Sequence, residues 1–215
     1  MPAKKRPGPK LLRFDRGLGG RFVAGADEAG RGPLAGPLVV AGVLLDYASL
    51  RDHRVRPLAL LNDSKQVDPE TRDELYRAVI ACAERVAVRV FPAAVIDRDG
   101  LHRCNLRGLR EVLWACQPAD ASLVDGFKLG PSAPAHRAVV DGDTKSAAIA
   151  AASIVAKVTR DRYMHHTADA LYPAYGFASH VGYITPGHTK VVRERGPCEI
   201  HRRSWRAKAF DPAPV

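Results

Sequence analysis

At residues 23–33 the chain reads Val23-Ala24-Gly25-Ala26-Asp27-Glu28-Ala29-Gly30-Arg31-Gly32-Pro33, an apolar run that ends in two adjacent carboxylates and continues into a Gly-Arg-Gly loop. Carboxylate oxygens are the ligands that hard divalent cations prefer. Glycines allow the backbone to approach a ligand closely, and a guanidinium can bind a phosphate through two donors. The stretch therefore predicts a strand that ends in a metal site beside a phosphate-binding loop. A strand that runs into an ordinary polar turn is the alternative that these residues alone leave open.

Short apolar runs around this stretch predict a sheet. Residues 22–26 and 38–45 are apolar and are broken by Gly and Pro, which is typical of buried strands joined by a turn. They lie too close in the sequence for a crossover helix, so we expect an antiparallel pair. Further strands are predicted over residues 86–91, 121–124 and 137–140.

Three segments carry helical patterns. Asp68 is suited to an N-cap and Pro69 to the first helical position, which predicts a helix that runs to about Glu84. Apolar residues recur at helical spacing over residues 105–116, and an Ala-rich helix is predicted over 146–163. Strands mixed with helices predict an α/β fold in which a mixed β-sheet is flanked by helices.

The chain is strongly basic. Its 33 Lys and Arg residues against 23 Asp and Glu residues give a formal net charge of +10. This balance favours an anionic partner, and nucleic acid is the usual one. No repeat or linker divides the chain, so we expect residues 1–20 to be a basic, disordered tail and residues 21–215 to form a single catalytic domain with a C-terminal helical segment.

The cysteines and the hydropathy pattern indicate a cytoplasmic protein without a membrane anchor. The four cysteines form no CxxC pair and have no metal-ligand spacing, so we interpret them as reduced thiols. No apolar stretch approaches the roughly 20 residues that a membrane span needs. The basic N-terminus lacks the apolar core of a secretory signal.

Three predicted strands end in acidic residues, namely Asp27 with Glu28, then Asp125, then Asp141 with Asp143. Strands that lie side by side would bring these carboxylates to one rim, where they would raise one another's pKa. A bound divalent cation removes that conflict, and oxygen ligands suit Mg²⁺ or Mn²⁺. Such a cluster beside a phosphate-binding loop indicates two-metal phosphodiester hydrolysis. Taken singly, Asp143 could instead cap the following helix, and Asp125 could begin an Asp-Gly turn.

Asp27 and Glu28 pose a geometric question. Neighbouring side chains on a strand point to opposite faces, so both carboxylates cannot reach one ion while the strand stays regular. Either the chain bends at this pair, or Glu28 contributes its backbone carbonyl. We expect Asp27 to be the bridging ligand.

Six motifs of this sequence, spread in order over residues 22–206, resemble ribonuclease HII, the type 2 ribonuclease H family. They are Gly25-Ala26-Asp27-Glu28-Ala29-Gly30-Arg31-Gly32-Pro33-Leu34-Ala35-Gly36-Pro37 with Leu61-Asn62-Asp63-Ser64-Lys65-Gln66; Val124-Asp125-Gly126; Gly142-Asp143-Thr144-Lys145-Ser146 with the helix after it; Tyr172-Pro173-Ala174-Tyr175-Gly176-Phe177; His180-Val181-Gly182-Tyr183; and His201-Arg202-Arg203-Ser204.

The resemblance implies a ribonuclease H-like fold with a small C-terminal helical extension. It implies an endonuclease that uses Mn²⁺ or Mg²⁺, hydrolyses the RNA strand of RNA–DNA hybrids, and nicks 5′ of single ribonucleotides in duplex DNA. The products would carry 3′-hydroxyl and 5′-phosphate ends, as ribonucleotide excision repair and DNA replication require. We expect a monomer, with RNA–DNA hybrids and ribonucleotide-containing duplex DNA as its partners.

The resemblance also implies roles for individual residues. The catalytic acids would be Asp27, Glu28, Asp125 and Asp143, of which Asp27, Glu28 and Asp125 would be metal ligands. The substrate-binding residues would be Gly30, Arg31, Gly32, Asn62, Ser64, Lys65 and Tyr183. Asp141 and Val181 depart from the family pattern, since lysine is common at both positions.

Other basic and histidine residues have two interpretations each. Lys157 could lie on a solvated helix face or reach the site, and His180 and His188 are expected to be loop histidines that bond locally rather than zinc ligands. A cluster near the C-terminus is expected to bind duplex phosphates, with a solvated basic face as the alternative. Its members are Arg193, Arg195, Arg202, Arg203, Arg206 and Lys208.

Two other classes of protein remain. Ribonuclease HIII shares the substrate type, but its acid-pair motif usually continues without Gly-Arg-Gly, and we expect this chain to have no room for its extra N-terminal domain. A catalytically silent nucleic-acid-binding module is less consistent with four retained acids, since carboxylates beside a phosphate site would only weaken binding. A nuclease assay with and without divalent metal separates these classes.

Overall fold

The computed structural model describes residues 7–50, 57–62, 64, 67–205 and 210. Its centre is a five-stranded mixed sheet in the order β3-β2-β1-β4-β5. The strands are β1 (Phe22–Ala29), β2 (Leu38–Asp46), β3 (Arg85–Phe91), β4 (Ala121–Asp125) and β5 (Arg137–Val139). β1 and β2 are antiparallel, whereas β4 runs parallel to β1 and to β5. The predicted mixed sheet and its antiparallel first pair are therefore confirmed.

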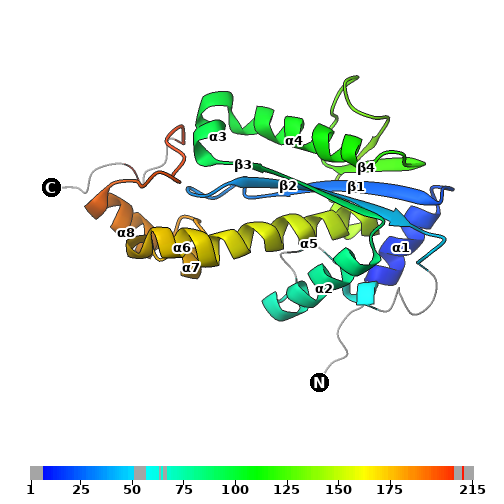
Figure 1. Cartoon of the computed structure of the whole chain (residues 1–215), viewed down its shortest axis with the longest axis horizontal. Coiled ribbons are helices and arrows are strands. Elements are labelled where there is room, and N and C mark those ends of the chain that lie inside the picture. The colour runs from blue at the N-terminus through cyan, green and yellow to red at the C-terminus, as the bar shows by residue number, and fades with distance from the viewer. Residues whose placement is uncertain (1–6, 51–56, 63, 65–66, 206–209, 211–215) are drawn as a thin grey trace.

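Helices cover both faces of the sheet (Figure 1). The long helix α5 (Ala147–Arg162) lies on one face with α2 (Pro69–Cys82), and α4 (Leu101–Ala115) lies on the other with α3 (Ala93–Asp99). One large hydrophobic cluster lies between the sheet and each of these helical layers. The helices expected over 69–84, 105–116 and 146–163 are confirmed, and α4 begins four residues earlier than expected.

Helix α5 packs against β1 because both surfaces are made of small residues. A Cβ atom on Gly25 would lie 2.1 Å from the Ala148 backbone, so only glycine permits this approach. The helix begins at Ser146, whose hydroxyl accepts a hydrogen bond from the Ile149 N–H. This close contact sets the height of α5 above the end of β1, where the acidic pair lies.

The N-terminal segment is not a disordered tail over the described residues, so that prediction is wrong there. Gly8–Arg16 forms helix α1, and its Leu11 and Leu12 are buried in the core beneath α5. Asp15 is also buried and accepts hydrogen bonds from the Tyr47 hydroxyl and the Ala148 N–H. An amphipathic helix with few apolar residues is hard to tell from a basic tail by composition.

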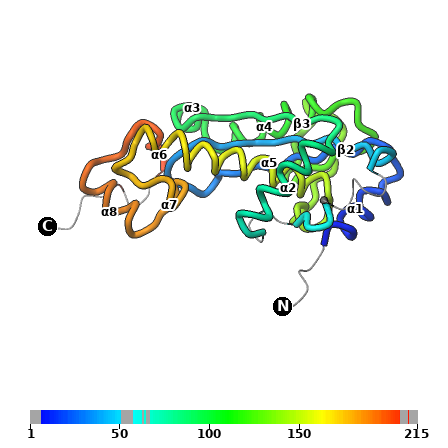
Figure 2. Tube along the Cα trace, turned by 60° about the horizontal axis from the view of Figure 1, so that its bottom comes forward, coloured from blue at the N-terminus to red at the C-terminus, as the bar shows by residue number. Residues whose placement is uncertain are grey.

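The C-terminal region forms the small helical extension that was expected. After α5 the chain passes through a π-helical turn, η4 (Tyr163–Ala168), and then α6 (Asp169–Leu171), η5 (Pro173–Tyr175), α7 (Phe177–His180) and α8 (Pro186–Arg195). These elements gather at one end of the molecule, opposite α1 (Figure 2). The shorter elements η2 (Pro57–Leu60) and η3 (Gly142–Thr144) lie in loops. Among the described residues, no helix is both long enough and apolar enough to cross a bilayer.

Candidate active site

A cavity of about 220 Å³ opens where β1 and β4 end. Residues from both strands, from η3, from α5 and from the loops after β1 and α7 line this cavity. They include Asp27, Glu28, Gly30, Arg31, Gly32, Ser64, Asp125, Asp143, Ser153, Lys157, Arg160 and Tyr183. The four acids expected from the sequence therefore share one cavity with the Gly-Arg-Gly loop.

Asp27 is the most deeply buried of the acids, with only 5% of its surface exposed. Burial raises the pKa of Asp27 well above its usual value, and the neighbouring charges of Glu28 and Asp125 raise it further. Its Oδ1 accepts a hydrogen bond of 2.7 Å from the Glu28 N–H, which offsets only part of this rise. Without a cation, the folded protein therefore disfavours a charge on Asp27.

Glu28 shows how the strand resolves the geometric question. β1 stays regular through this pair, with Glu28 opposite Val40 of β2, so the chain does not bend. Burial raises the pKa of Glu28, while Arg31 and the nearby Asn105 of α4 lower it in part. Because the cavity lies beyond the strand end, both carboxylates line it from opposite faces of the sheet.

Asp125 and Asp143 complete the acidic rim. Asp125 is the last residue of β4, and its Oδ1 accepts a 2.7 Å hydrogen bond from the Gly142 N–H. Asp143 lies in η3, and the cap of α5 is Ser146, so capping is not the reason for an acid at position 143. An Asp-Gly turn does follow β4, as the alternative held, and the Asp125 side chain faces the cavity all the same.

The donor set fits a hard divalent cation. The Oε2 atom of Glu28 is buried and accepts no hydrogen bond from any residue that the structure describes. Four carboxylates around one cavity, with the pKa values of Asp27 and Glu28 raised, are charges that a cation would neutralise. In the described part of the chain, no three acid, histidine or cysteine side chains already stand where they could hold one ion together.

Two buried arginines hold the backbone that follows β1, from Gly30 to Pro37, and the sequence did not predict these contacts. The Arg202 guanidinium donates to the carbonyl oxygens of Gly30 and Gly36, and that of Arg160 donates to those of Ala35 and Pro37. Arg160 and Arg202 are almost fully buried. Because these guanidinium groups hydrogen-bond to the backbone carbonyl oxygens, they fix the path of the backbone that lines the cavity.

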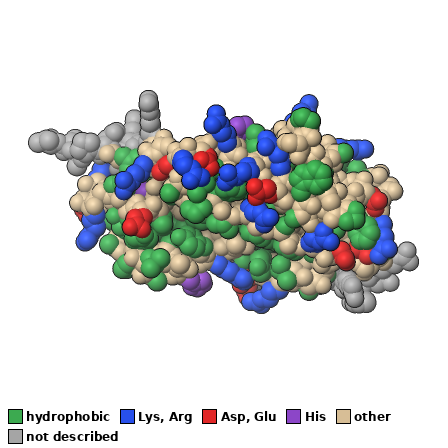
Figure 3. Space-filling view, turned by 45° about the horizontal axis from the view of Figure 1, so that its top comes forward, with side chains coloured by type: hydrophobic (Ala, Val, Ile, Leu, Met, Phe, Trp, Pro, Cys, Tyr) green, Lys and Arg blue, Asp and Glu red, His purple; other side chains and the backbone are tan. Residues whose placement is uncertain are grey.

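The expected role of Arg202 at a duplex-binding surface is therefore wrong. Its side chain lies inside the protein, whereas that of Arg203 is exposed. Arg206 and Lys208, the last members of that cluster, lie outside the described residues. Basic side chains also recur over the face that carries α3 and α4, with acidic ones among them (Figure 3).

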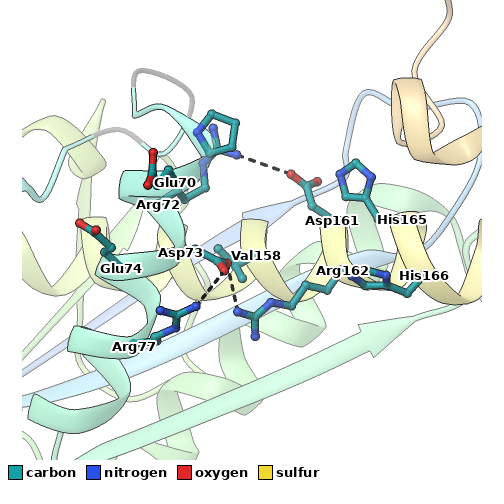
Figure 4. Close-up of a pocket in the computed structure, with 11 residues that line it drawn as sticks. Glu70, Arg72, Asp73, Glu74, Arg77, Val158, Asp161, Arg162, His165 and His166 are labelled. Atoms are coloured by element: carbon teal, nitrogen blue, oxygen red, sulfur yellow. Dashed lines mark hydrogen bonds and ion pairs between the residues drawn. The ribbon is translucent and has the colours of Figure 1, made fainter.

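The loop before α2 contributes Ser64 to the site. Ser64 is buried, and its Oγ accepts a 3.0 Å hydrogen bond from the Ser153 hydroxyl of α5. Arg72 of α2 donates to the Ser64 carbonyl and forms an ion pair with Asp161 (Figure 4). Asn62, expected beside Ser64, does not line the cavity, and Lys65 lies outside the described residues.

Lys157 and Tyr183 form the open side of the cavity. Lys157 bonds to Asp161 at 2.8 Å, and its ammonium lies 5.9 Å from the centre of the Tyr183 ring. Lys157 therefore belongs to the rim rather than to a solvated face. Tyr183 is 40% exposed, and one edge of its ring lies 3.7 Å from where a Cβ on Gly32 would be.

Comparison with known proteins first defines the class. The crystal structure of the ribonuclease H2 from Pyrococcus horikoshii OT3 matches with a TM-score of 0.72 and 26% identity, covering 86% of this chain and 94% of that one. A mixed sheet flanked by helices, with acids at the ends of adjacent central strands, is thus a ribonuclease H-like fold.

Sequence comparison then gives the family. The family model for ribonuclease HII matches residues 24–208. Ribonuclease HII of Salinispora tropica is 48% identical over 199 residues, which cover 91% of this chain and 72% of the relative. Ribonuclease HII of Nocardia farcinica is 47% identical over 185 residues, which cover 86% of this chain and 71% of the relative. The chain belongs to the ribonuclease HII family and is a hydrolase of RNA in RNA–DNA hybrids.

Proposed function

We propose that this enzyme also nicks duplex DNA on the 5′ side of a single embedded ribonucleotide. The observation that carries the proposal is that the four acids, the Gly-Arg-Gly loop and Tyr183 share one cavity. Acids alone would support hydrolysis of any phosphodiester. The narrow space between Gly32 and Tyr183 adds a place where the sugar itself can be read.

Recognition of the ribose depends on the loop after β1. Gly32 is exposed, and apart from its chain neighbours the Tyr183 ring is the one group of the described residues within 4 Å of where its Cβ would be. A sugar can therefore approach the Gly32 backbone closely, and its 2′-hydroxyl can hydrogen-bond with backbone groups as deoxyribose cannot. Arg31 is exposed and stacks over the Phe127 ring at 5.0 Å, from where its guanidinium can reach an adjacent phosphate.

Hydrolysis would take place at the carboxylates. We propose that Asp27, Glu28 and Asp125 would hold Mn²⁺ or Mg²⁺, and that Asp143 completes the acidic site beside them. Bound cations would supply a nucleophilic water and stabilise the charge on the leaving oxygen. Water then adds to phosphorus and the bond to the 3′ oxygen breaks, which leaves a 3′-hydroxyl and a 5′-phosphate. We propose that Lys157 and Ser64 bind the flanking phosphates and that Tyr183 packs on the next deoxyribose.

We further propose that the chain acts as a monomer and that residues 21–215 form one catalytic domain, to which α1 adds a helical support. The buried contacts of Asp15 with Tyr47 and Ala148 favour this arrangement, because they join α1 to the start of α5. Sedimentation of the purified chain tests the oligomeric state.

The test uses three duplexes of one sequence: all-DNA, DNA with one ribonucleotide, and an RNA–DNA hybrid. With Mn²⁺ or Mg²⁺ present, we expect cleavage of the second and third duplexes and none of the first. The nick in the second should lie 5′ of the ribonucleotide and leave an end that a polymerase extends. Equal cleavage of the all-DNA duplex would remove the 2′-hydroxyl from recognition.

A further inference from the structure

The backbone that presents Tyr183 has an unusual conformation. Val181 and Gly182 have φ angles of +43° and +84°. The left-handed region is unfavourable for a β-branched residue and persists only where the surroundings hold it. Here the Val181 carbonyl accepts a 3.0 Å hydrogen bond from Arg160, and the Gly182 carbonyl accepts one of 2.9 Å from the Leu34 N–H. The turn before Tyr183 is thus fixed on the side of the cavity.

Two buried histidines hold the other side. His188 Nδ1 lies 2.8 Å from the Tyr183 carbonyl oxygen, and His188 Nε2 lies 3.0 Å from His201 Nε2. His201 Nδ1 in turn accepts a 3.0 Å hydrogen bond from the Cys198 N–H. His188 and His201 are 0% and 1% exposed, so water cannot replace any partner in this series of hydrogen bonds.

The backbone groups at the two ends of this hydrogen-bonded series determine which ring nitrogens carry the protons. The Cys198 N–H can only donate, so His201 Nδ1 must accept and the His201 proton is on Nε2. The Tyr183 carbonyl can only accept, so the His188 proton is on Nδ1. His201 Nε2–H then donates to His188 Nε2, and both rings are neutral. These tautomers follow from the hydrogen bonds around each ring.

A third histidine completes the support. His180 Nε2 lies 2.9 Å from the Tyr175 carbonyl oxygen, and its Nδ1 accepts a 3.2 Å hydrogen bond from the Gly182 N–H. His180 is therefore also neutral, and its ring stacks on that of His188 with centroids 4.2 Å apart. His180 and His188 thus bond to the backbone of Gly182 and Tyr183, and His201 supports His188 from behind.

An additional proton on His188 or His201 would break this series of hydrogen bonds, because two N–H groups would then face each other. Burial lowers the pKa of His188 and lowers that of His201 to about 4. Among the residues that the structure describes, the ionisable groups that face the pair are His180, Tyr175, Cys198 and Arg203, and none of these is a carboxylate. The surroundings therefore favour the neutral pair across the physiological range.

We propose that His188 and His201 are positioning residues for Tyr183. As a neutral hydrogen-bonded pair they hold its carbonyl group and so fix the direction of its ring at the rim of the cavity. This inference rests on the proposed function, in which Tyr183 packs on a sugar beside the cleaved bond. Neither histidine touches the substrate.

The first test is spectroscopic and needs no substrate. Nitrogen-15 spectra of the histidine rings in the full chain should show the Nδ1–H tautomer for His188 and the Nε2–H tautomer for His180 and His201. His188 and His201 should both stay neutral from pH 8 to pH 6, because burial lowers the pKa of each ring. The Nε2–H tautomer for His188, or an imidazolium at either position of the pair at pH 6, would overturn the proposal.

The second test is a double-mutant cycle on the single-ribonucleotide duplex. His188→Ala should lower the maximal single-turnover rate by about 10- to 100-fold, because misplacement of a positioning group acts on the rate. His188→Asn, whose amide N–H can replace Nδ1–H, should restore the rate to within about fivefold of wild type. In a Tyr183→Ala background, His188→Ala should cost no more than about twofold.

The outcomes of this cycle are distinct. Fully additive losses would mean that His188 does not act through Tyr183, and would overturn the inference while leaving the proposed function intact. Wild-type protein that cleaves the hybrid but not the single-ribonucleotide duplex would refute the proposed function, and the cycle is then run on the hybrid. His166→Ala is the matched control and should leave the rate unchanged, and circular dichroism at the assay temperature confirms that each variant is folded.

Discussion

Replacement of Arg202 by methionine should destabilise the protein far more than the same replacement of its neighbour Arg203. Arg202 donates to the carbonyl oxygens of Gly30, Arg31 and Gly36 inside the protein, and the hydrogen bonds to Gly30 and Gly36 are the shorter ones. A hydrogen bond to a charged group contributes about 1.5–3 kcal/mol, so the loss of both corresponds to about 3–6 kcal/mol. Burial opposes this, since it lowers the pKa of Arg202 to about 9, and removal of the charge recovers that cost. We expect a net loss of about 3 kcal/mol in the free energy of unfolding.

The assay is urea denaturation followed by circular dichroism. Arg202→Met should lower the midpoint without changing the slope, and Arg203→Met should stay within about 0.5 kcal/mol of wild type, as exposed positions do. Arg202→Lys keeps the charge but not the planar fork, and should lose an intermediate amount. An Arg202→Met variant within about 1 kcal/mol of wild type would refute the view that this residue holds the loop.

Three further predictions follow from the geometry of the site. Gly32→Ala should leave the melting temperature unchanged but abolish cleavage of single-ribonucleotide duplexes. Gly30→Ala should instead destabilise the protein by about 1–3 kcal/mol, because the φ angle of Gly30 is +95° and a Cβ there would lie 2.4 Å from Arg160 Nε. Equal thermal stability of the two variants would contradict this difference between the two glycines. Without metal, the raised pKa of Asp27 means that the free energy of unfolding falls as pH rises from the unfolded pKa of 3.8 through the folded pKa. Asp27→Asn should therefore be about 1–2 kcal/mol more stable than wild type at pH 8, and this gain should vanish near pH 4. A variant that is less stable than wild type at pH 8 would mean that the buried charge of Asp27 does not destabilise the metal-free protein. The lowered pKa of His201 acts in the opposite direction, so the stability that it contributes is complete above about pH 6.5 and is lost as pH falls to about 4, and His201→Gln should flatten the melting temperature over this range.

The acidic site could be predicted from the sequence because local patterns place it. A carboxylate at the end of an apolar strand lies where that strand leaves the sheet. Because β1 and β4 are neighbours and parallel, Asp27 and Asp125 lie close together, and Asp143 follows shortly after β5, the next strand. The antiparallel start of the sheet follows in the same way from a short connection. Here a backbone rule and a residue type were sufficient.

The supports of the site could not be predicted from the sequence. Arg202 and Gly30 are 172 residues apart, and an arginine in a basic stretch is far more often a surface charge. Likewise, His188 lies in α8 and meets His201 only because the segment after α8 packs back against that helix. Which polar side chains are buried is decided by tertiary contacts, and local periodicity carries no record of these.

We propose that the four acids around one cavity perform metal-dependent cleavage at a ribonucleotide. Single-turnover cleavage of the single-ribonucleotide duplex by wild type and by Asp125→Asn, each titrated with Mn²⁺ from metal-free protein, tests it most directly. We expect wild-type cleavage to begin only as Mn²⁺ is added, and Asp125→Asn to bind the duplex with near-normal affinity while its rate falls by at least about 10³-fold. Cleavage by metal-free wild type, or a near-normal rate in Asp125→Asn, would mean that these acids do not hold a catalytic metal.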